Sequence, residues 1–159
     1  MSPNERNIMP RTVPFDLKFY KNRNDTATSI DPKIPFFTGT ISAGFPSPAD
    51  DHMDKKLDLN ELLIQHPAAT FFVKVSGNSM EDIGIHDGDT LIVDRALKAN
   101  DGSVVIAVLN GELTVKRVRR SARGMELVPE NRHMRPIDIS PEMDLEIWGV
   151  VTNVIHRIK

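Results

Sequence analysis

Apolar residues along the chain predict one short helix and then a series of strands. Asp58 is a helix-capping residue, Glu61 stands three positions later, and an apolar run at 62–64 follows before Pro67. This order is typical of a capped helix that ends near the proline. From residue 70 onward, runs rich in β-branched and aromatic residues favour strands instead. The predicted strands cover residues 71–75, 90–93, 104–109, 112–118 and 145–155.

The last predicted strand, at 145–155, is long, and its apolar residues are partly continuous rather than strictly alternating. Such a run is typical of a strand buried on both faces or lying at an interface. We expect this strand in the core. The more specific alternative places it at an edge where two copies of the chain meet. The body of the protein is therefore predicted to be mainly β.

Asn110-Gly111 is the strongest hairpin signal in the chain, because both residues can adopt the positive φ angles of a two-residue turn. The strands on either side are therefore expected to pair antiparallel. Counting outward from the turn places Lys116 opposite Val105. Ala107 and Val118 then lie on the same face of the hairpin as Lys116.

The first forty residues differ from this body. Prolines at positions 3, 10, 14, 32 and 35, together with several Asn and Asp residues, interrupt any helical period. We expect a flexible or extended arm here. The chain of 159 residues is long enough for one domain with a sizeable core.

Composition and charge exclude several classes of protein. The net charge of −2 gives no general attraction to nucleic acid, and the basic run at 116–120 more often marks a solvated strand end, so direct DNA binding is not expected. The absence of cysteine excludes disulfides, a thiol nucleophile and cysteine metal sites. No apolar run resembles a signal peptide or is long enough to cross a bilayer. We expect a cytoplasmic chain with no membrane contact, no cofactor and no bound metal.

The segment Ser76-Gly77-Asn78-Ser79-Met80 directly follows the strand at 71–75. A glycine near a serine at a strand end lets the backbone turn and expose the hydroxyl beside free N–H groups, as an acyl-transfer nucleophile requires. The same run is more often only a polar turn. A serine nucleophile also needs a base, and the histidines form no evident triad and are expected at the surface or in turns. They stand at positions 52, 66, 86, 133 and 156.

Lysine can act as that base when burial lowers its pKa. Lys116 faces valine and alanine in the predicted hairpin, which makes it the best candidate for a neutral amine. Several other lysines lie in polar surroundings: Lys55, Lys56, Lys98 and Lys159. The alternative is an edge strand from which Lys116 points outward and prevents pairing with another strand. Spacing alone does not decide between these two interpretations.

Three segments of the body resemble the LexA/UmuD family of self-cleaving serine/lysine peptidases. They are Ser76-Gly77-Asn78-Ser79-Met80, Gly88-Asp89-Thr90-Leu91-Ile92-Val93-Asp94 and Thr114-Val115-Lys116-Arg117. The similarity to this family runs from about Phe37 to the C-terminus. Other segments are similar to the UmuD branch in particular. They are Gly44-Phe45-Pro46-Ser47-Pro48-Ala49, Leu59-Asn60-Glu61-Leu62-Leu63-Ile64-Gln65-His66-Pro67 and Phe72-Val73-Lys74.

The resemblance implies a compact, curled antiparallel sheet or partial barrel of the LexA and signal-peptidase type. It implies that Ser79 is the nucleophile and that Lys116, 37 residues later, is the general base. In the corresponding mechanism, backbone N–H groups of Asn78 and Ser79 hold the developing oxyanion. The hairpin register and the resemblance thus select the same lysine.

The resemblance also implies a scissile bond at Ala43-Gly44. Cleavage there separates the arm at 1–43 from a peptidase and dimerisation domain at 44–159. Small residues allow the loop to bend into the site without obstruction. Some relatives in the UmuD branch have Cys before that glycine, whereas this chain has Ala, as the repressor-type relatives do.

The family further implies a role in the SOS response to DNA damage. A RecA filament on single-stranded DNA stimulates cleavage, and the processed homodimer joins the UmuC subunit in an error-prone translesion DNA polymerase. The resemblance also suggests the replicative polymerase clamp as a further partner.

Three other functions compete with this one. A LexA-like repressor, or a fragment of one, needs a winged helix-turn-helix that an arm with five prolines cannot supply. A signal peptidase shares the chemistry but requires a membrane anchor. A catalytically silent β-domain would serve only as an assembly scaffold, with Ser79 as a turn residue and Lys116 as an edge lysine.

Overall fold

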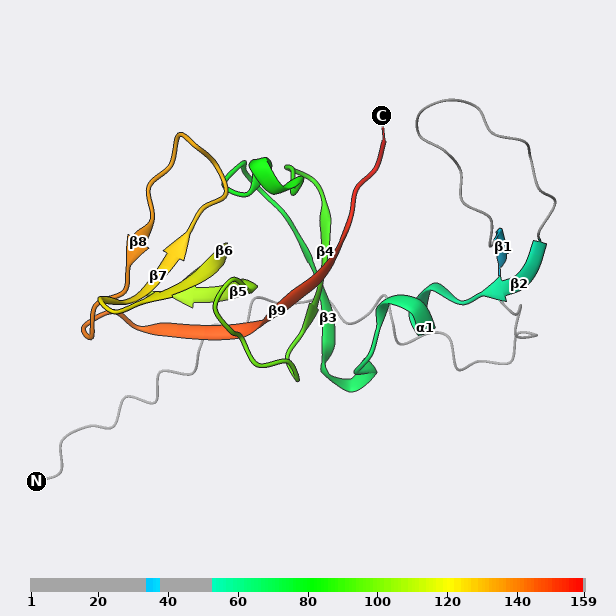
Figure 1. Ribbon diagram of the computed structural model, residues 1–159, viewed down its shortest axis with the longest axis horizontal. Helices are drawn as coiled ribbons and strands as arrows, with labels where there is room; N and C mark the ends of the chain where they lie inside the picture. The colour runs from blue at the N-terminus through cyan, green and yellow to red at the C-terminus, as the bar shows by residue number, and fades with distance from the viewer. Residues whose placement is uncertain (1–33, 38–52, 159) are drawn as a thin grey trace, which may run out of the picture. The chain divides into compact units, whose positions relative to one another are not determined.

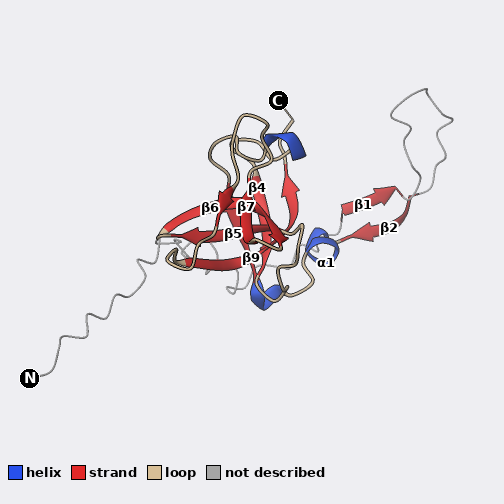
Figure 2. Ribbon diagram, turned by 60° about the vertical axis from the view of Figure 1, so that its left-hand side comes forward, coloured by secondary structure: helices blue, strands red, loops and turns tan. Residues whose placement is uncertain are grey.

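The computed structural model describes residues 34–37 and 53–158 of the chain. Strands dominate this part (Figure 2), which confirms the predicted mainly β class. β1 (Ile34–Phe37) and β2 (Met53–Leu57) pair antiparallel, so a strand from the predicted arm pairs with one from the predicted body. The Ala43-Gly44 bond lies outside the described residues.

The main sheet has seven strands in the order β3-β4-β9-β5-β6-β7-β8, and every neighbouring pair is antiparallel. Within the described ranges no pairing joins β8 back to β3, so the sheet is not closed. This agrees with the expected antiparallel sheet or partial barrel. The strands are β3 (Thr70–Lys74), β4 (Thr90–Asp94), β5 (Val104–Leu109), β6 (Glu112–Ser121), β7 (Gly124–Val128), β8 (Ile137–Asp138) and β9 (Leu145–Ile155).

The predicted helix is confirmed as α1 (Leu59–Leu63). The Asp58 carboxylate accepts a hydrogen bond from the Asn60 backbone N–H at 2.8 Å, which is the cap that the sequence predicts. Two short 3₁₀ turns, η2 (Pro67–Ala69) and η3 (Glu81–Ile83), lie outside the predicted elements. The second of these turns begins two residues after Ser79.

β5 and β6 form the predicted hairpin. Asn110 and Gly111 have φ angles of 50° and 86°, as the two-residue turn requires. The register pairs Val105 with Lys116, which confirms the position predicted for the lysine. β6 extends past the predicted end and pairs with β7 on its other side, so it is an interior strand of the sheet.

β9 lies in the middle of the sheet, between β4 and β5 (Figure 1). Its first half pairs with β5 and its second half pairs with β4, and the strand bends as it passes from one neighbour to the other. The alternative of an edge strand at a dimer interface is therefore wrong, because both sides of β9 are paired within the chain. At the bend, a Cβ atom on Gly149 would lie 2.8 Å from Val93 Cγ1, so a glycine permits this close approach of the strands.

The hydrophobic core occupies both faces of the sheet. Ile106 of β5 belongs to one cluster, and its neighbours Val105 and Ala107 belong to the other, because side chains alternate along a strand. β9 contributes to both clusters, with Trp148 on one face and Ile147 on the other. This two-sided packing agrees with its partly continuous apolar run.

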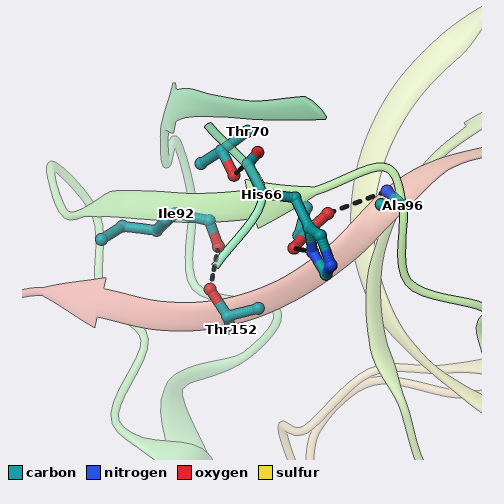
Figure 3. A network of polar contacts seen from close by, with 6 residues as sticks. His66, Thr70, Ile92, Ala96 and Thr152 are labelled. Atoms are coloured by element: carbon teal, nitrogen blue, oxygen red, sulfur yellow. Dashed lines mark hydrogen bonds and ion pairs between the residues drawn. The ribbon is translucent and has the colours of Figure 1, made fainter. Parts of the chain in front are cut away.

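Buried aspartates flank β4 at both ends. At its C-terminal end the Asp94 side chain is only 3% exposed, and one of its carboxylate oxygens lies 2.7 Å from His66 Nδ1 (Figure 3). The other oxygen accepts a hydrogen bond from the Ala96 N–H at 2.8 Å. The bond from His66 is the largest cause of the lowered pKa of Asp94. These contacts hold the segment before β3 against the end of β4.

No helix in the parts of the chain that the structure describes is long and apolar enough to cross a membrane.

Candidate active site

Ser79 lies in a loop that leaves β3 and is held by backbone hydrogen bonds. Val75 donates to the Asp89 carbonyl at 2.9 Å and accepts from Gly88 at 3.0 Å. Gly77 has a φ of 92°, which favours glycine, and its N–H donates to the Asp87 carboxylate at 2.8 Å. The chain can therefore turn sharply just before the serine.

Residues on both sides of Ser79 also hold it in place. Met80 is only 1% exposed and anchors the loop in the core. Asn131, which is 8% exposed, donates its side-chain amide to the Asn78 carbonyl at 2.9 Å. The Asn131 side-chain oxygen accepts from the His133 N–H at 2.9 Å, so the orientation of the amide is fixed. The loop between β7 and β8 thus supports the serine loop from a distant part of the sequence.

Lys116 lies opposite Val105, as the register predicts, and its side chain reaches Ser79 from β6. Its Nζ lies 3.1 Å from Ser79 Oγ, 2.7 Å from Thr114 Oγ1 and 3.0 Å from the Val115 carbonyl oxygen. The side chain is half-buried, and burial lowers the pKa of the Lys116 amine below its ordinary value of 10.5. Because β6 is an interior strand and Lys116 faces the serine, the edge-lysine interpretation is wrong.

The three neighbours of Nζ are all oxygen atoms, which can accept from an ammonium and can also accommodate a neutral amine. Such an amine has two N–H donors and one lone pair, whereas the ammonium has three donors and no acceptor. The Thr114 and Val115 oxygens can accept the two N–H bonds. The lone pair is then free for the Ser79 hydroxyl proton. The arrangement is able to activate a serine by direct proton transfer.

Backbone donors for an oxyanion stand beside the serine. In the part of the chain that the structure describes, neither the Asn78 N–H nor the Ser79 N–H donates to an acceptor. Unpaired N–H groups next to a nucleophile can stabilise the charge of a tetrahedral intermediate. All three predicted site residues in the described ranges, Asn78, Ser79 and Lys116, are therefore close together. The predicted cleavage-site residues, Ala43 and Gly44, lie outside those ranges.

Sequence reasoning missed Thr114 and Asn131. Thr114 could have been found, since it stands two positions before Lys116 and therefore shares its face of the strand. Asn131 gives no such signal, because it stands 131 − 79 = 52 positions after Ser79 in a loop with no regular spacing.

The basic run at 116–120 is only partly solvated. Lys116 points toward the serine, Arg117 forms an ion pair with Glu130, and Arg119 lies 3.7 Å from Glu126. The expectation of a solvated strand end therefore holds for Arg119 and Arg120, which are exposed, but not for Lys116 and Arg117.

Comparison with known proteins gives consistent matches. The family Peptidase S24-like matches residues 35–152, a range that contains Ser79 and Lys116. Protein MucA of Salmonella typhimurium is 50% identical over 121 residues, which cover 76% of this chain and 82% of MucA. Protein SamA of Salmonella typhimurium is 46% identical over 130 residues, which cover 82% of this chain and 90% of SamA. A LexA repressor of Glaesserella parasuis is 38% identical over 133 residues, which cover 83% of this chain and 63% of the repressor.

Proposed function

Because the chain belongs to the Peptidase S24-like family, we propose that it is a serine peptidase of the UmuD type that cuts its own Ala43-Gly44 bond. Ser79 acts as the nucleophile and Lys116 as the general base. The observation that carries this proposal is the 3.1 Å contact between Lys116 Nζ and Ser79 Oγ, made by an amine whose pKa burial lowers.

The reaction begins when neutral Lys116 takes the Ser79 hydroxyl proton and Oγ attacks the Ala43 carbonyl carbon. The N–H groups of Asn78 and Ser79 donate to the resulting oxyanion. Protonated Lys116 then gives its proton to the Gly44 nitrogen, and the peptide bond breaks to leave an Ala43 ester on Ser79. Water, deprotonated by Lys116, hydrolyses that ester and restores the hydroxyl.

Tethering makes a simple two-residue site sufficient for this reaction. A substrate segment held in the same chain, or in a dimer, acts at an effective concentration that can reach roughly 10⁵ M. The intact protein must therefore keep the segment mostly undocked until a partner shifts the equilibrium. In this proposal the partner is a RecA filament on single-stranded DNA.

Cleavage produces the biological signal. It removes the arm at 1–43 and leaves residues 44–159, which form a homodimer in the cytoplasm. The dimer joins a UmuC subunit in an error-prone translesion polymerase during the SOS response, and the replicative polymerase clamp is a further partner.

The experiment that tests this function follows the intact mass of the untagged full-length chain over time. We expect a shift to the mass of residues 44–159, and a faster shift when RecA, ATP and single-stranded DNA are all present. Omitting the DNA is the matched control, because no filament then forms. An unchanged mass under every condition, including alkaline pH, would leave only the assembly-scaffold function. Cleavage without stimulation would contradict only the role of RecA.

Asn131→Ala should slow cleavage without changing its chemistry. The substitution removes the amide that holds the Asn78 carbonyl, and a hydrogen bond of this kind contributes about 0.5–1.5 kcal/mol. We therefore expect the cleavage rate to fall roughly 2- to 10-fold at every pH, with the shape of the pH profile unchanged. Intact-mass time courses at a series of pH values measure both quantities.

Arg132→Ala is the matched control for Asn131→Ala, since Arg132 is an exposed neighbour whose backbone N–H, rather than its side chain, donates to Asp82. An Asn131→Ala rate equal to that of the control would contradict a positioning role. A shifted pH profile would mean that Asn131 acts on Lys116 instead.

A further inference from the structure

His86, Asp89 and His156 form a cluster outside the candidate active site. His86 and Asp89 belong to the turn before β4, and His156 directly follows β9. Each residue offers one ligand atom, and these atoms all lie within 4.8 Å of one another. The pairing of β4 with β9 therefore brings together residues that are 156 − 86 = 70 positions apart.

Asp89 is held rigidly at the centre of the cluster. Its side chain is only 3% exposed, and one carboxylate oxygen accepts the His86 backbone N–H at 2.8 Å. The Asp89 N–H in turn donates to the His86 carbonyl at 3.1 Å. The other carboxylate oxygen lies 2.7 Å from His156 Nδ1. The carboxylate is thus oriented by the backbone before any ligand arrives.

His86 Nδ1 is buried and lacks a hydrogen-bond partner among the described residues. It lies 3.7 Å from the Asp89 carboxylate, beyond hydrogen-bond distance, and the two imidazole rings are 5.0 Å apart. A buried polar atom without a partner costs free energy. This nitrogen therefore indicates that a group outside the described residues completes the cluster.

We propose that His86, Asp89 and His156 bind a divalent transition-metal ion, with Zn²⁺ as the preferred ion. Two imidazole nitrogens and one carboxylate are typical zinc ligands, and water can fill the fourth position. Zinc bonds of about 2.0–2.2 Å place neighbouring ligand atoms about 3.4 Å apart. On binding, atoms that now lie up to 4.8 Å apart close in by about 1 Å, while His156 Nδ1 moves away from the Asp89 oxygen that lies 2.7 Å from it. Both histidine side chains are about half exposed and can make this movement. Each imidazole then binds through Nδ1 and carries its proton on Nε2.

The ion joins the end of β9 to a turn that holds the serine loop. His156 lies at the end of β9, while the turn that carries His86 also contains Asp87, whose carboxylate accepts the Gly77 N–H. Binding should therefore stabilise the folded protein, because an ion that binds only the native state shifts the unfolding equilibrium. The sequence predicted surface or turn positions for both histidines, and their convergence on one aspartate depends on strand pairing.

The test uses an untagged full-length chain with Ser79→Ala, which keeps the sample uniform and makes the result independent of cleavage. We expect Zn²⁺ to bind with one-to-one stoichiometry in a calorimetric titration and to raise the melting temperature. Co²⁺ should give the visible absorption of a tetrahedral site. His86→Ala and His156→Ala should each weaken Zn²⁺ binding by more than the roughly 10- to 100-fold expected from loss of an outer-shell partner.

His66→Ala is the matched control, because His66 pairs with a buried aspartate that has no second histidine beside it among the described residues. It should bind Zn²⁺ as tightly as the parent chain. Absence of binding in the parent chain, or equal binding in the His86 and His156 variants, overturns the proposal. Circular dichroism verifies that each variant is folded, so a loss of binding cannot be attributed to unfolding.

Discussion

Ser79→Ala chains should remain whole under conditions in which the wild-type chain loses residues 1–43. Alanine has no hydroxyl to attack the Ala43 carbonyl, and loss of a serine nucleophile that acts together with its base lowers the rate by about 10⁴- to 10⁶-fold. The side chain is small and half-buried, so the melting temperature should change little. Intact-mass time courses with RecA filaments measure the effect.

Ser76→Ala is the control for this experiment. Ser76 is an exposed serine in the same loop, and its substitution should leave the cleavage rate unchanged. If Ser79→Ala chains were cut at the same bond as fast as wild type, the nucleophile would have to be another residue. If both variants were inactive, the loop itself would be disturbed and the assignment of Ser79 would lose its support.

The cleavage rate should rise with pH and reach a plateau once Lys116 is fully neutral. Burial lowers the pKa of this amine below 10.5, so the neutral form increases as pH rises through the lowered pKa. The plateau should therefore be reached at a lower pH than an exposed lysine would allow. Single-turnover rates over a pH series measure the profile.

Lys116→Arg keeps a positive charge at this position but removes the group that can act as a base. A guanidinium is never deprotonated in this pH range, so the variant should show no cleavage at any pH, with a loss comparable to that of Ser79→Ala. Lys98→Ala is the control, since Lys98 is exposed, and its profile should match wild type. A wild-type cleavage rate that does not change with pH would falsify the role of Lys116. Cleavage by Lys116→Arg with the wild-type dependence on pH would do the same.

Local signals predicted the parts of the site that depend on neighbours in sequence. The turn at Asn110 and Gly111 determines the register of β5 and β6, and that register alone placed Lys116 opposite Val105. The Asp58 cap likewise predicted α1. In both cases a few adjacent residues determine the geometry, so no knowledge of the rest of the fold was needed.

Features that depend on distant contacts could not be predicted in this way. The apolar run of β9 was compatible with a core strand and with an edge strand, because periodicity does not reveal which strands will be its neighbours. Asn131 and the His86 cluster are similar cases, since each brings together residues that are far apart in sequence and meet only in the folded sheet. β7 and β8 were missed because β7 begins with a glycine and β8 has only two residues.

The central position of β9 also affects when Ser79 and Lys116 can come together during translation. Ser79 follows β3, Lys116 lies on β6, and β9 is the strand that joins these two halves of the sheet. A chain emerging from the ribosome presents both halves long before it presents residues 145–155. Until then the serine and the lysine have no common sheet to hold them 3.1 Å apart. The topology therefore delays the contact between Ser79 and Lys116 until translation of the domain is nearly complete, so under the proposed function a nascent chain is not cut prematurely.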